Sequence, residues 1–237
     1  MKALKAGPSL TEQVHEAILS EIASGKLRPG ARIIQEQLAD ELGVSRQPIQ
    51  QALALLRKEG VLYDAPGRGL QVAPLDLEHV RHMYDVRAVI EGLAFRKAAE
   101  SGAAQAKSKG AVLIRAGRKA VASASYEAMI AADMAFHDFF YTLSGNPLVA
   151  PSMERYWTQA RRVMGEVLMR DDKPRDIWDQ HEALLEAVAA GDGARAEELA
   201  RAHILDAAEF MIRRLRAERA RADQPGGSGA SAAAGLQ

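Results

Sequence analysis

Strand-forming segments are confined to one short part of the chain, and this limits the fold more than any other feature of the sequence. Two β-prone runs, VLYD at 61–64 and LQVA at 70–73, flank the turn residues APGRG and predict a hairpin. Elsewhere apolar residues recur at the three- and four-residue spacing of helices. The chain is therefore predicted to be mainly α, with strands only in this hairpin.

Three predicted helices precede the hairpin. The first covers 10–24 and ends at the loop GKLRPG. The second is short and closes at Gly43, where a left-handed backbone is easily adopted. The third covers 46–59, with Ser45 as its N-cap. Three helices followed by a hairpin wing are the order of a winged helix-turn-helix domain, which we assign to residues 1–75.

From residue 76 onward the pattern is entirely helical and predicts an all-α antiparallel helical bundle over 76–221. Its six expected helices lie near 77–100, 103–123, 126–144, 148–169, 174–190 and 193–221. The last segment, 222–237, is rich in Gly, Ser and Ala without periodicity, and we expect it to be disordered.

Composition excludes several classes of site. The chain has no cysteine, so disulfides, thiolate metal sites and cysteine nucleophiles are ruled out. It has no apolar run approaching 18 residues and no apolar core of a signal peptide, so we expect a soluble, cytoplasmic protein without a membrane partner. Its 31 basic residues balance 31 acidic ones, and residues 1–74 carry nine against eight. Any DNA binding would therefore depend on a few placed residues rather than on a broad basic field.

The third helix has the two faces of a recognition helix. One face is apolar and consists of Ile49, Ala52, Leu53 and Leu56. The opposite face is polar near the N-terminus and consists of Arg46, Gln47, Gln50 and Gln51. Such side chains can read base edges in the major groove, Arg on guanine and Gln on adenine. A polar face that merely meets water is the alternative, and the adjoining turn and hairpin favour DNA reading.

These residues also carry a family resemblance. The run LADELGVSRQPIQQALALLRKEGVLYDAPGRGLQV, with GKLRPGARI before it, resembles the winged-helix domain of the GntR family. The resemblance implies that Ser45, Arg46 and Gln47 contact double-stranded DNA. It also implies that Gly67 and Arg68 lie at a wing tip entering the minor groove, although a tight hairpin needs a glycine in any case.

One departure from the family pattern concerns charge. The family usually has Arg-Glu where this chain has Gln50 and Gln51. A neutral amide at Gln50 should make DNA binding less dependent on salt than in other members.

The helical half contains a candidate metal site. Asp133 and His137 lie four residues apart on an apolar helical face, and His181 and His203 lie within apolar stripes of two later helices. One such histidine is more often a core residue than a ligand. Four ionisable groups pointing into one interior indicate metal binding, because burial without a partner is costly. Three imidazoles and a carboxylate suit a divalent ion, with zinc the first choice and nickel, manganese or iron as alternatives.

The spacing of these four residues resembles the FadR C-terminal domain (FCD) of one GntR subgroup. The intervals here are 4, 44 and 22 residues, and LSGNP around Asn146 also fits that pattern. The resemblance implies a small organic carboxylate as effector, completing the coordination of the metal. By the same resemblance, Asn146 is expected to contact the effector.

Arg87 is the second candidate effector contact. It lies within an apolar stripe and should face inward, where it could meet an anion, or it could pair with Glu91 one turn later. Arg161 and Arg162 are weaker candidates.

The expected function is thus a homodimeric, ligand-responsive regulator that binds a palindromic operator. A metal-dependent enzyme is one alternative, since such a site could activate water, but no recognisable catalytic motif accompanies it. A regulator that senses the metal itself is another. An acyl-CoA-binding regulator is a third, although it would not need the four ligands.

Overall fold

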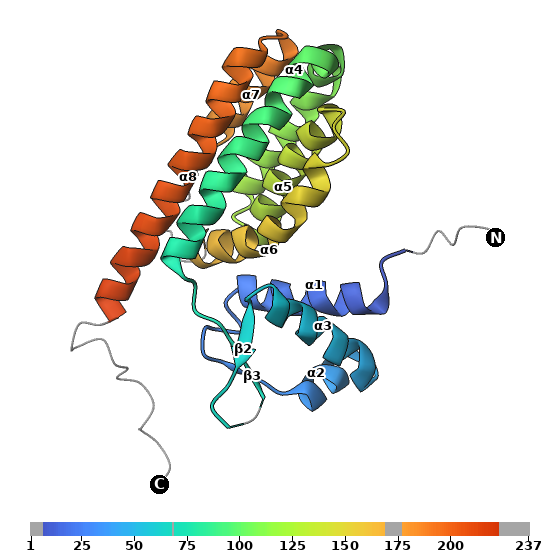
Figure 1. Ribbon diagram of the computed structural model, residues 1–237, viewed down its shortest axis with the longest axis vertical. Helices are drawn as coiled ribbons and strands as arrows, with labels where there is room; N and C mark the ends of the chain where they lie inside the picture. Colours follow the sequence, from blue (N-terminus) through green and yellow to red (C-terminus); the bar gives the residue numbers. More distant parts are fainter. Residues whose placement is uncertain (1–6, 68, 169–176, 223–237) are drawn as a thin grey trace, which may run out of the picture.

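The computed structural model describes residues 7–67, 69–168 and 177–222 of the 237-residue chain. Figure 1 shows a small N-terminal half below a bundle of long helices. The N-terminal half contains α1 (Leu10–Ala23), β1 (Arg32–Ile33), α2 (Gln35–Leu42), α3 (Arg46–Lys58), β2 (Leu62–Asp64) and β3 (Leu70–Val72). The bundle contains α4 (Leu77–Ala122), α5 (Tyr126–Leu143), α6 (Val149–Leu168), α7 (Trp178–Ala189) and α8 (Gly193–Ala222).

The sheet of the N-terminal half has one more strand than predicted. β2 and β3 form the expected antiparallel hairpin, with Tyr63 opposite Gln71. β1 adds to the other edge of β3, so the strand order is β1-β3-β2. A strand of two residues is too short to show an alternating pattern, which is why the sequence did not predict it.

The three short helices end largely where local signals predicted. α1 begins with a complete capping box between Ser9 and Glu12. α2 ends at Gly43, which has a φ of 64°. Ser45 stands at the N-cap of α3, but its side chain makes no cap hydrogen bond, which leaves the hydroxyl on the exposed surface. The apolar faces of α1 and α3 meet in a core that includes Ile18 and Leu53.

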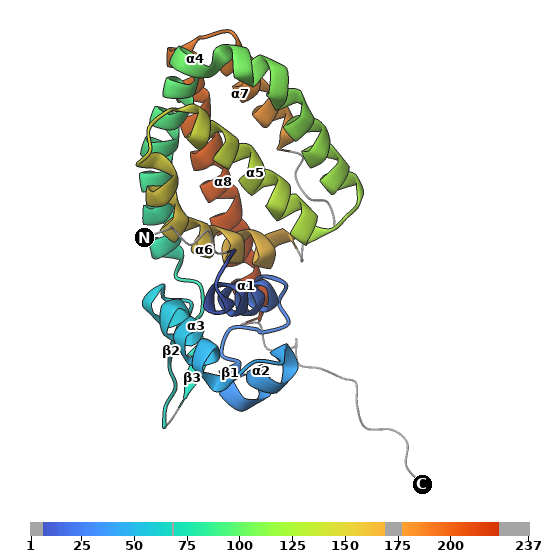
Figure 2. The same ribbon diagram turned by 90° about the vertical axis from the view of Figure 1, so that its right-hand side faces the viewer.

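The bundle has five helices in the described part of the chain, and the predicted break in the first of them is wrong. α4 runs unbroken for 46 residues through the SGA sequence that suggested an end. Gly102 allows Leu143 to approach, because a Cβ at that position would lie 2.3 Å from Leu143 Cγ. The glycine therefore serves close packing. Figure 2 shows the two halves of α4 pointing in different directions, so the chain reverses without a loop.

In the helical half, three predicted segments fall partly outside the described residues. The helix expected over 148–169 is described to Leu168 as α6, and residue 169 is not described. The helix expected from 174 begins at Trp178, and 174–176 are not described. Of the predicted tail, residues 223–237 are not described and Ala222 ends α8. No helix in the described ranges is both long enough and apolar enough to cross a bilayer.

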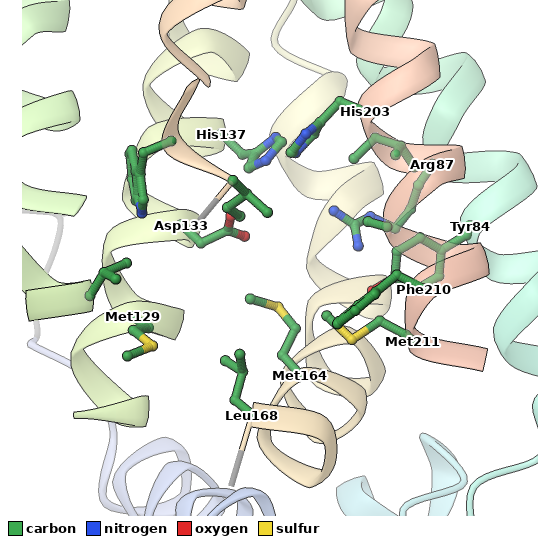
Figure 3. Close-up of a pocket in the computed structure, with 15 residues that line it drawn as sticks. Tyr84, Arg87, Met129, Asp133, His137, Met164, Leu168, His203, Phe210 and Met211 are labelled. Atoms are coloured by element: carbon green, nitrogen blue, oxygen red, sulfur yellow. The ribbon is translucent and has the colours of Figure 1, made fainter. Parts of the chain in front are cut away.

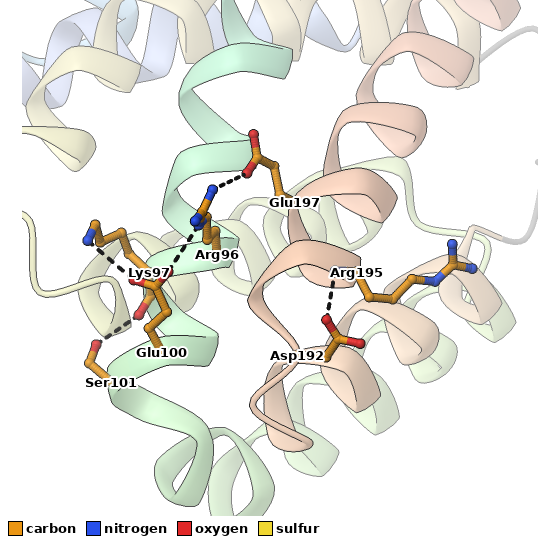
Figure 4. A network of polar contacts seen from close by, with 7 residues as sticks. All are labelled: Arg96, Lys97, Glu100, Ser101, Asp192, Arg195 and Glu197. Carbon is orange, nitrogen blue, oxygen red and sulfur yellow. Dashed lines mark hydrogen bonds and ion pairs between the residues drawn. The ribbon is translucent and has the colours of Figure 1, made fainter.

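α4 and α8 lie side by side and form one core cluster mainly with α6 and a second with α5 and α7. Figure 4 shows a polar link along their exposed edge, where Arg96 donates to Glu100 on α4 and to Glu197 on α8. The second half of α4 also packs closely on α7. Gly117 faces the Trp178 ring, and any side chain there would overlap that ring.

α6 joins the bundle to the N-terminal half, and Figure 2 shows it lying above α1. Gln159 donates to the Glu59 carbonyl at 2.7 Å, and Arg162 donates to the Ala73 carbonyl at 2.6 Å. Arg161, a weak effector candidate from sequence, instead pairs with Glu16 of α1. Arg162 is also engaged at this junction and does not line the cavity described below.

Candidate metal centre and DNA-reading surface

Four predicted ligands converge in the interior of the bundle. α5 contributes Asp133 and His137 one turn apart, α7 contributes His181, and α8 contributes His203. All four side chains are buried, and one potential ligand atom from each lies within 4.8 Å of the others. Figure 3 shows His137 and His203 side by side with Asp133 next to them.

His181 is held in position by aromatic rings. Its ring centroid lies 4.2 Å from that of Phe136 and 4.5 Å from that of Trp178. Neither ring nitrogen has a hydrogen-bond partner among the described residues. Burial lowers the pKa of this imidazole well below its ordinary value, and the neighbouring His203 and His137 lower it further. His181 is therefore neutral at physiological pH, which is the form that binds metals.

The other two imidazoles have partners outside the cluster. His203 Nδ1 lies 2.9 Å from Gln180 Oε1. His137 Nδ1 lies 2.6 Å from Glu91 Oε2, at ion-pair distance although outside hydrogen-bond angles. A carboxylate or amide on the outer nitrogen of a histidine is the arrangement that orients a metal-binding imidazole.

Glu91 connects this cluster to Arg87. Arg87 Nε donates to Glu91 Oε1 at 2.9 Å, so the predicted pairing on one helix is confirmed. Both side chains are almost completely buried. Burial alone would raise the pKa of Glu91, but the charges of Arg87 and His137 lower it to about 2. The sequence indicates Glu91 only as a partner of Arg87. Its contact with His137 comes from another helix and has no signal in the local pattern.

The cluster fits a divalent cation. Burial raises the pKa of Asp133, and the charges of His137 and Arg87 only partly oppose this effect. His181 Nε2 is 3.5 Å from Asp133 Oδ1. Ligand atoms around one zinc-sized ion can be at most roughly 4.4 Å apart, so shifts of less than about 1 Å would complete a coordination shell. A cation here would stabilise the buried Asp133 carboxylate and give a partner to one of the two unpartnered ring nitrogens of His181.

A cavity adjoins the cluster and has Arg87 in its wall. Its lining is mostly apolar around a few polar groups, which is the composition of a small-molecule site. Asn146 does not line this cavity, so the effector contact expected there is not supported by its position. Its Oδ1 instead accepts a hydrogen bond from Leu148 N in the loop before α6. A turn-forming asparagine explains this part of the LSGNP motif.

The predicted DNA-reading side chains lie on the exposed face of α3. Ser45, Arg46, Gln47 and Gln50 are exposed. Arg46 forms an ion pair with Glu36 of α2, which the sequence did not predict. A guanine contact would have to replace this pair.

The wing tip is only partly described. Gly67 is exposed with a φ of 95° in open space, so the turn needs a glycine whether or not DNA is bound. Arg68 lies outside the described residues.

Comparison with known proteins gives matches across both halves. The model of the FCD domain matches residues 82–206, and the model of bacterial regulatory proteins of the gntR family matches residues 10–72. An uncharacterized HTH-type transcriptional regulator in an unstable DNA locus of Streptomyces ambofaciens is 30% identical over 200 residues, 81% of this chain and 80% of the relative. The HTH-type transcriptional regulator McbR of Escherichia coli strain K12 is 27% identical over 151 residues, 64% of this chain and 68% of McbR. The solved structure of E. coli McbR/YncC superposes with a TM-score of 0.75 at 23% identity, covering 88% of this chain and 100% of that one.

Proposed function

Because the chain belongs to the GntR family of bacterial regulatory proteins and carries an FCD domain, we propose that it regulates transcription in response to a small carboxylate held at a divalent metal. Its relatives are transcription regulators and not enzymes. The buried site therefore serves ligand sensing rather than turnover. The domain bounds we propose are 1–75 for DNA binding and 76–221 for sensing.

The observation that carries the sensing role is the convergence of Asp133, His137, His181 and His203 from three helices. These residues would hold the ion, with zinc the first choice for three imidazoles and one carboxylate. A bound ion would supply open coordination positions for a carboxylate oxygen. Arg87, in the wall of the same cavity, would add a cationic hydrogen-bond donor for that carboxylate.

In the proposed DNA-binding role, six residues contact the bases or the phosphate backbone of DNA: Ser45, Arg46, Gln47, Gln50, Gly67 and Arg68. One recognition helix covers little DNA, so we propose a homodimer on a palindromic operator. Val86, Val89 and Leu93 lie at i, i+3 and i+7 on α4 and are all more than 40% exposed. This apolar stripe would supply a dimer contact from the helical half. Binding to chromosomal DNA would place the protein in the cytoplasm.

Replacing one ligand tests the metal-dependent sensing directly. His181→Ala should lose the bound ion, melt at a lower temperature and no longer change its operator affinity on adding a carboxylate. Basal operator binding should persist, because the winged helix has its own core. The operator is first selected by binding from a pool of random DNA duplexes. One preparation of the protein is then used to measure metal content by mass spectrometry, the melting temperature and the affinity for that operator.

His79→Ala is the matched control, since His79 is an exposed histidine at the start of α4. It should behave as the unaltered protein. Full metal occupancy together with an intact carboxylate response in His181→Ala would contradict the site. A change in operator affinity on adding metal alone would favour a metal sensor over a carboxylate sensor.

A further inference from the structure

The cavity beside the candidate metal cluster has two chemically different ends. Figure 3 shows Asp133, His137 and His203 together on one side, while Met164 and Leu168 lie on the other. Ten of the fifteen lining residues have hydrocarbon, thioether or indole side chains. A ligand that fills this space would therefore need a polar head and an apolar body.

The apolar end contains an unusual share of the methionines. Three of the eight in the chain line the cavity, Met129 from α5, Met164 from α6 and Met211 from α8. Methionine has an unbranched, polarisable side chain that adapts to the shape of its partner. Three such side chains from different helices suit a flexible hydrocarbon chain better than a rigid polar molecule.

The charges at the polar end suit one carboxylate. The charges of Arg87 and Glu91 cancel within their buried pair. Asp133 would offset half the charge of a divalent ion, which leaves a single positive charge. With the charges of the described side chains alone, a ligand with one carboxylate would balance that positive charge, whereas a dicarboxylate would leave an excess buried negative charge.

We propose that the ligand of this cavity is an aliphatic monocarboxylate of medium chain length, with its carboxylate at the metal cluster and its chain among Met129, Met164 and Met211. The proposal rests on the proposed function and narrows the class of effector. From His203 to Met211 the wall formed by α8 extends about 12 Å at 1.5 Å per residue. Among the side chains that the structure describes, Met129, Met164 and Met211 would give a hydroxyl or second carboxylate at that end only apolar neighbours.

Calorimetric titration of the zinc-loaded protein with butyrate, hexanoate, octanoate and adipate tests this class. Affinity should rise about fourfold per added methylene until the cavity is filled, the factor expected for burying one CH₂. Adipate has the six carbons of hexanoate and a second carboxylate, and it should bind at least about tenfold more weakly. Equal affinity across the three monocarboxylates, or adipate binding as well as hexanoate, would overturn the proposal but leave carboxylate sensing intact. If none of these acids, and neither acetate nor lactate, bound at all, both proposals would fail.

Two variants on one helix locate the chain-binding end. Met129→Gln places an amide in the apolar end and should weaken octanoate binding about tenfold, with butyrate within about twofold of its normal affinity. Met134→Gln is the control, because Met134 lies on α5 outside the cavity lining and should leave both affinities unchanged. If octanoate affinity fell equally in both variants, or fell in neither, this placement of the hydrocarbon chain would be excluded.

Discussion

Glu91 is the residue that connects the candidate effector contact to the candidate metal ligands. Its two carboxylate oxygens face Arg87 and His137, which lie on different helices. By analogy with other carboxylate–histidine–metal arrangements, Glu91→Gln should weaken zinc binding by about 10- to 100-fold, because the amide is a poorer partner for the imidazole. Competition with a chromophoric chelator measures this affinity without any DNA.

Glu100→Gln is the control for this substitution. Glu100 lies on α4 as well, but it is exposed and pairs with Arg96. Its replacement should not change zinc affinity. Equal zinc affinity of Glu91→Gln and the unaltered protein would show that Glu91 has no part in positioning His137.

His181 gives the stability a defined pH dependence. Its pKa is lowered well below 6.5 in the folded state, chiefly by burial. Below about pH 6.5 the unfolded chain therefore binds a proton that the folded chain does not, so stability falls as pH falls. Above that pH this group contributes no slope. Because His181 takes up one proton, it can change the free energy of unfolding by at most about 1.4 kcal/mol per pH unit.

Thermal melting between about pH 5 and pH 8 measures this slope. The zinc-loaded protein should lose more stability on acidification than the metal-free protein, because protons also compete for the ligand nitrogens. In metal-free His181→Ala the contribution of this residue should disappear, and in metal-free His79→Ala it should remain. Identical slopes in the two variants would assign the pH dependence to other groups.

At the scale of single elements, α3 is expected to determine which DNA sequence is bound. Arg46 lies at its exposed N-terminal end and is held by Glu36 of α2. Arg46→Ala should cost about 1–3 kcal/mol of operator affinity if the side chain makes a bidentate contact with guanine. Binding to the operator and to a scrambled duplex is compared at fixed salt, and the loss should be specific to the operator.

Lys58→Ala is the control at the other end of α3, about 18 Å away along the helix. It should change operator and scrambled-duplex affinities alike, and only slightly, since any contact it makes would be with phosphate. Unchanged operator affinity in Arg46→Ala would exclude α3 as the reading element.

α6 lies between the two halves of the protein and connects the cavity to the DNA-binding half. Met164 and Leu168 line the cavity, whereas Gln159 and Arg162 donate hydrogen bonds to backbone carbonyls of the N-terminal half. Arg162→Met should keep zinc and carboxylate binding. The carboxylate-dependent change in operator affinity should fall to less than half, because the two halves would be held less rigidly.

Arg155→Met is the matched control, an exposed arginine on the same helix. It should leave the response unchanged. The melting temperature of both variants shows whether the fold is retained, and carboxylate binding is measured by the same titration. A full operator response in Arg162→Met would mean that the signal does not depend on this contact.

Most helices, the hairpin and the group of four candidate ligands could be predicted from the residues along the chain. Helical spacing and turn residues such as Gly43 act through neighbours along the chain, so they can be read locally. The ligands could be grouped because each occupies the centre of an apolar stripe, where an ionisable residue needs a partner. In the structure Asp133, His137, His181 and His203 do meet.

The remaining features depend on how the helices pack in three dimensions. α4 is continuous through Gly102, where the missing side chain leaves room for Leu143. Local helix propensity cannot distinguish a glycine needed for close packing from one that ends a helix. Packing also brings Glu91 to His137 and Arg162 to Ala73, partners that are 46 and 89 positions away along the chain. It also keeps Asn146 out of the cavity. Contacts of this kind depend on how whole helices pack, and the spacing of residues within one helix carries no information about them.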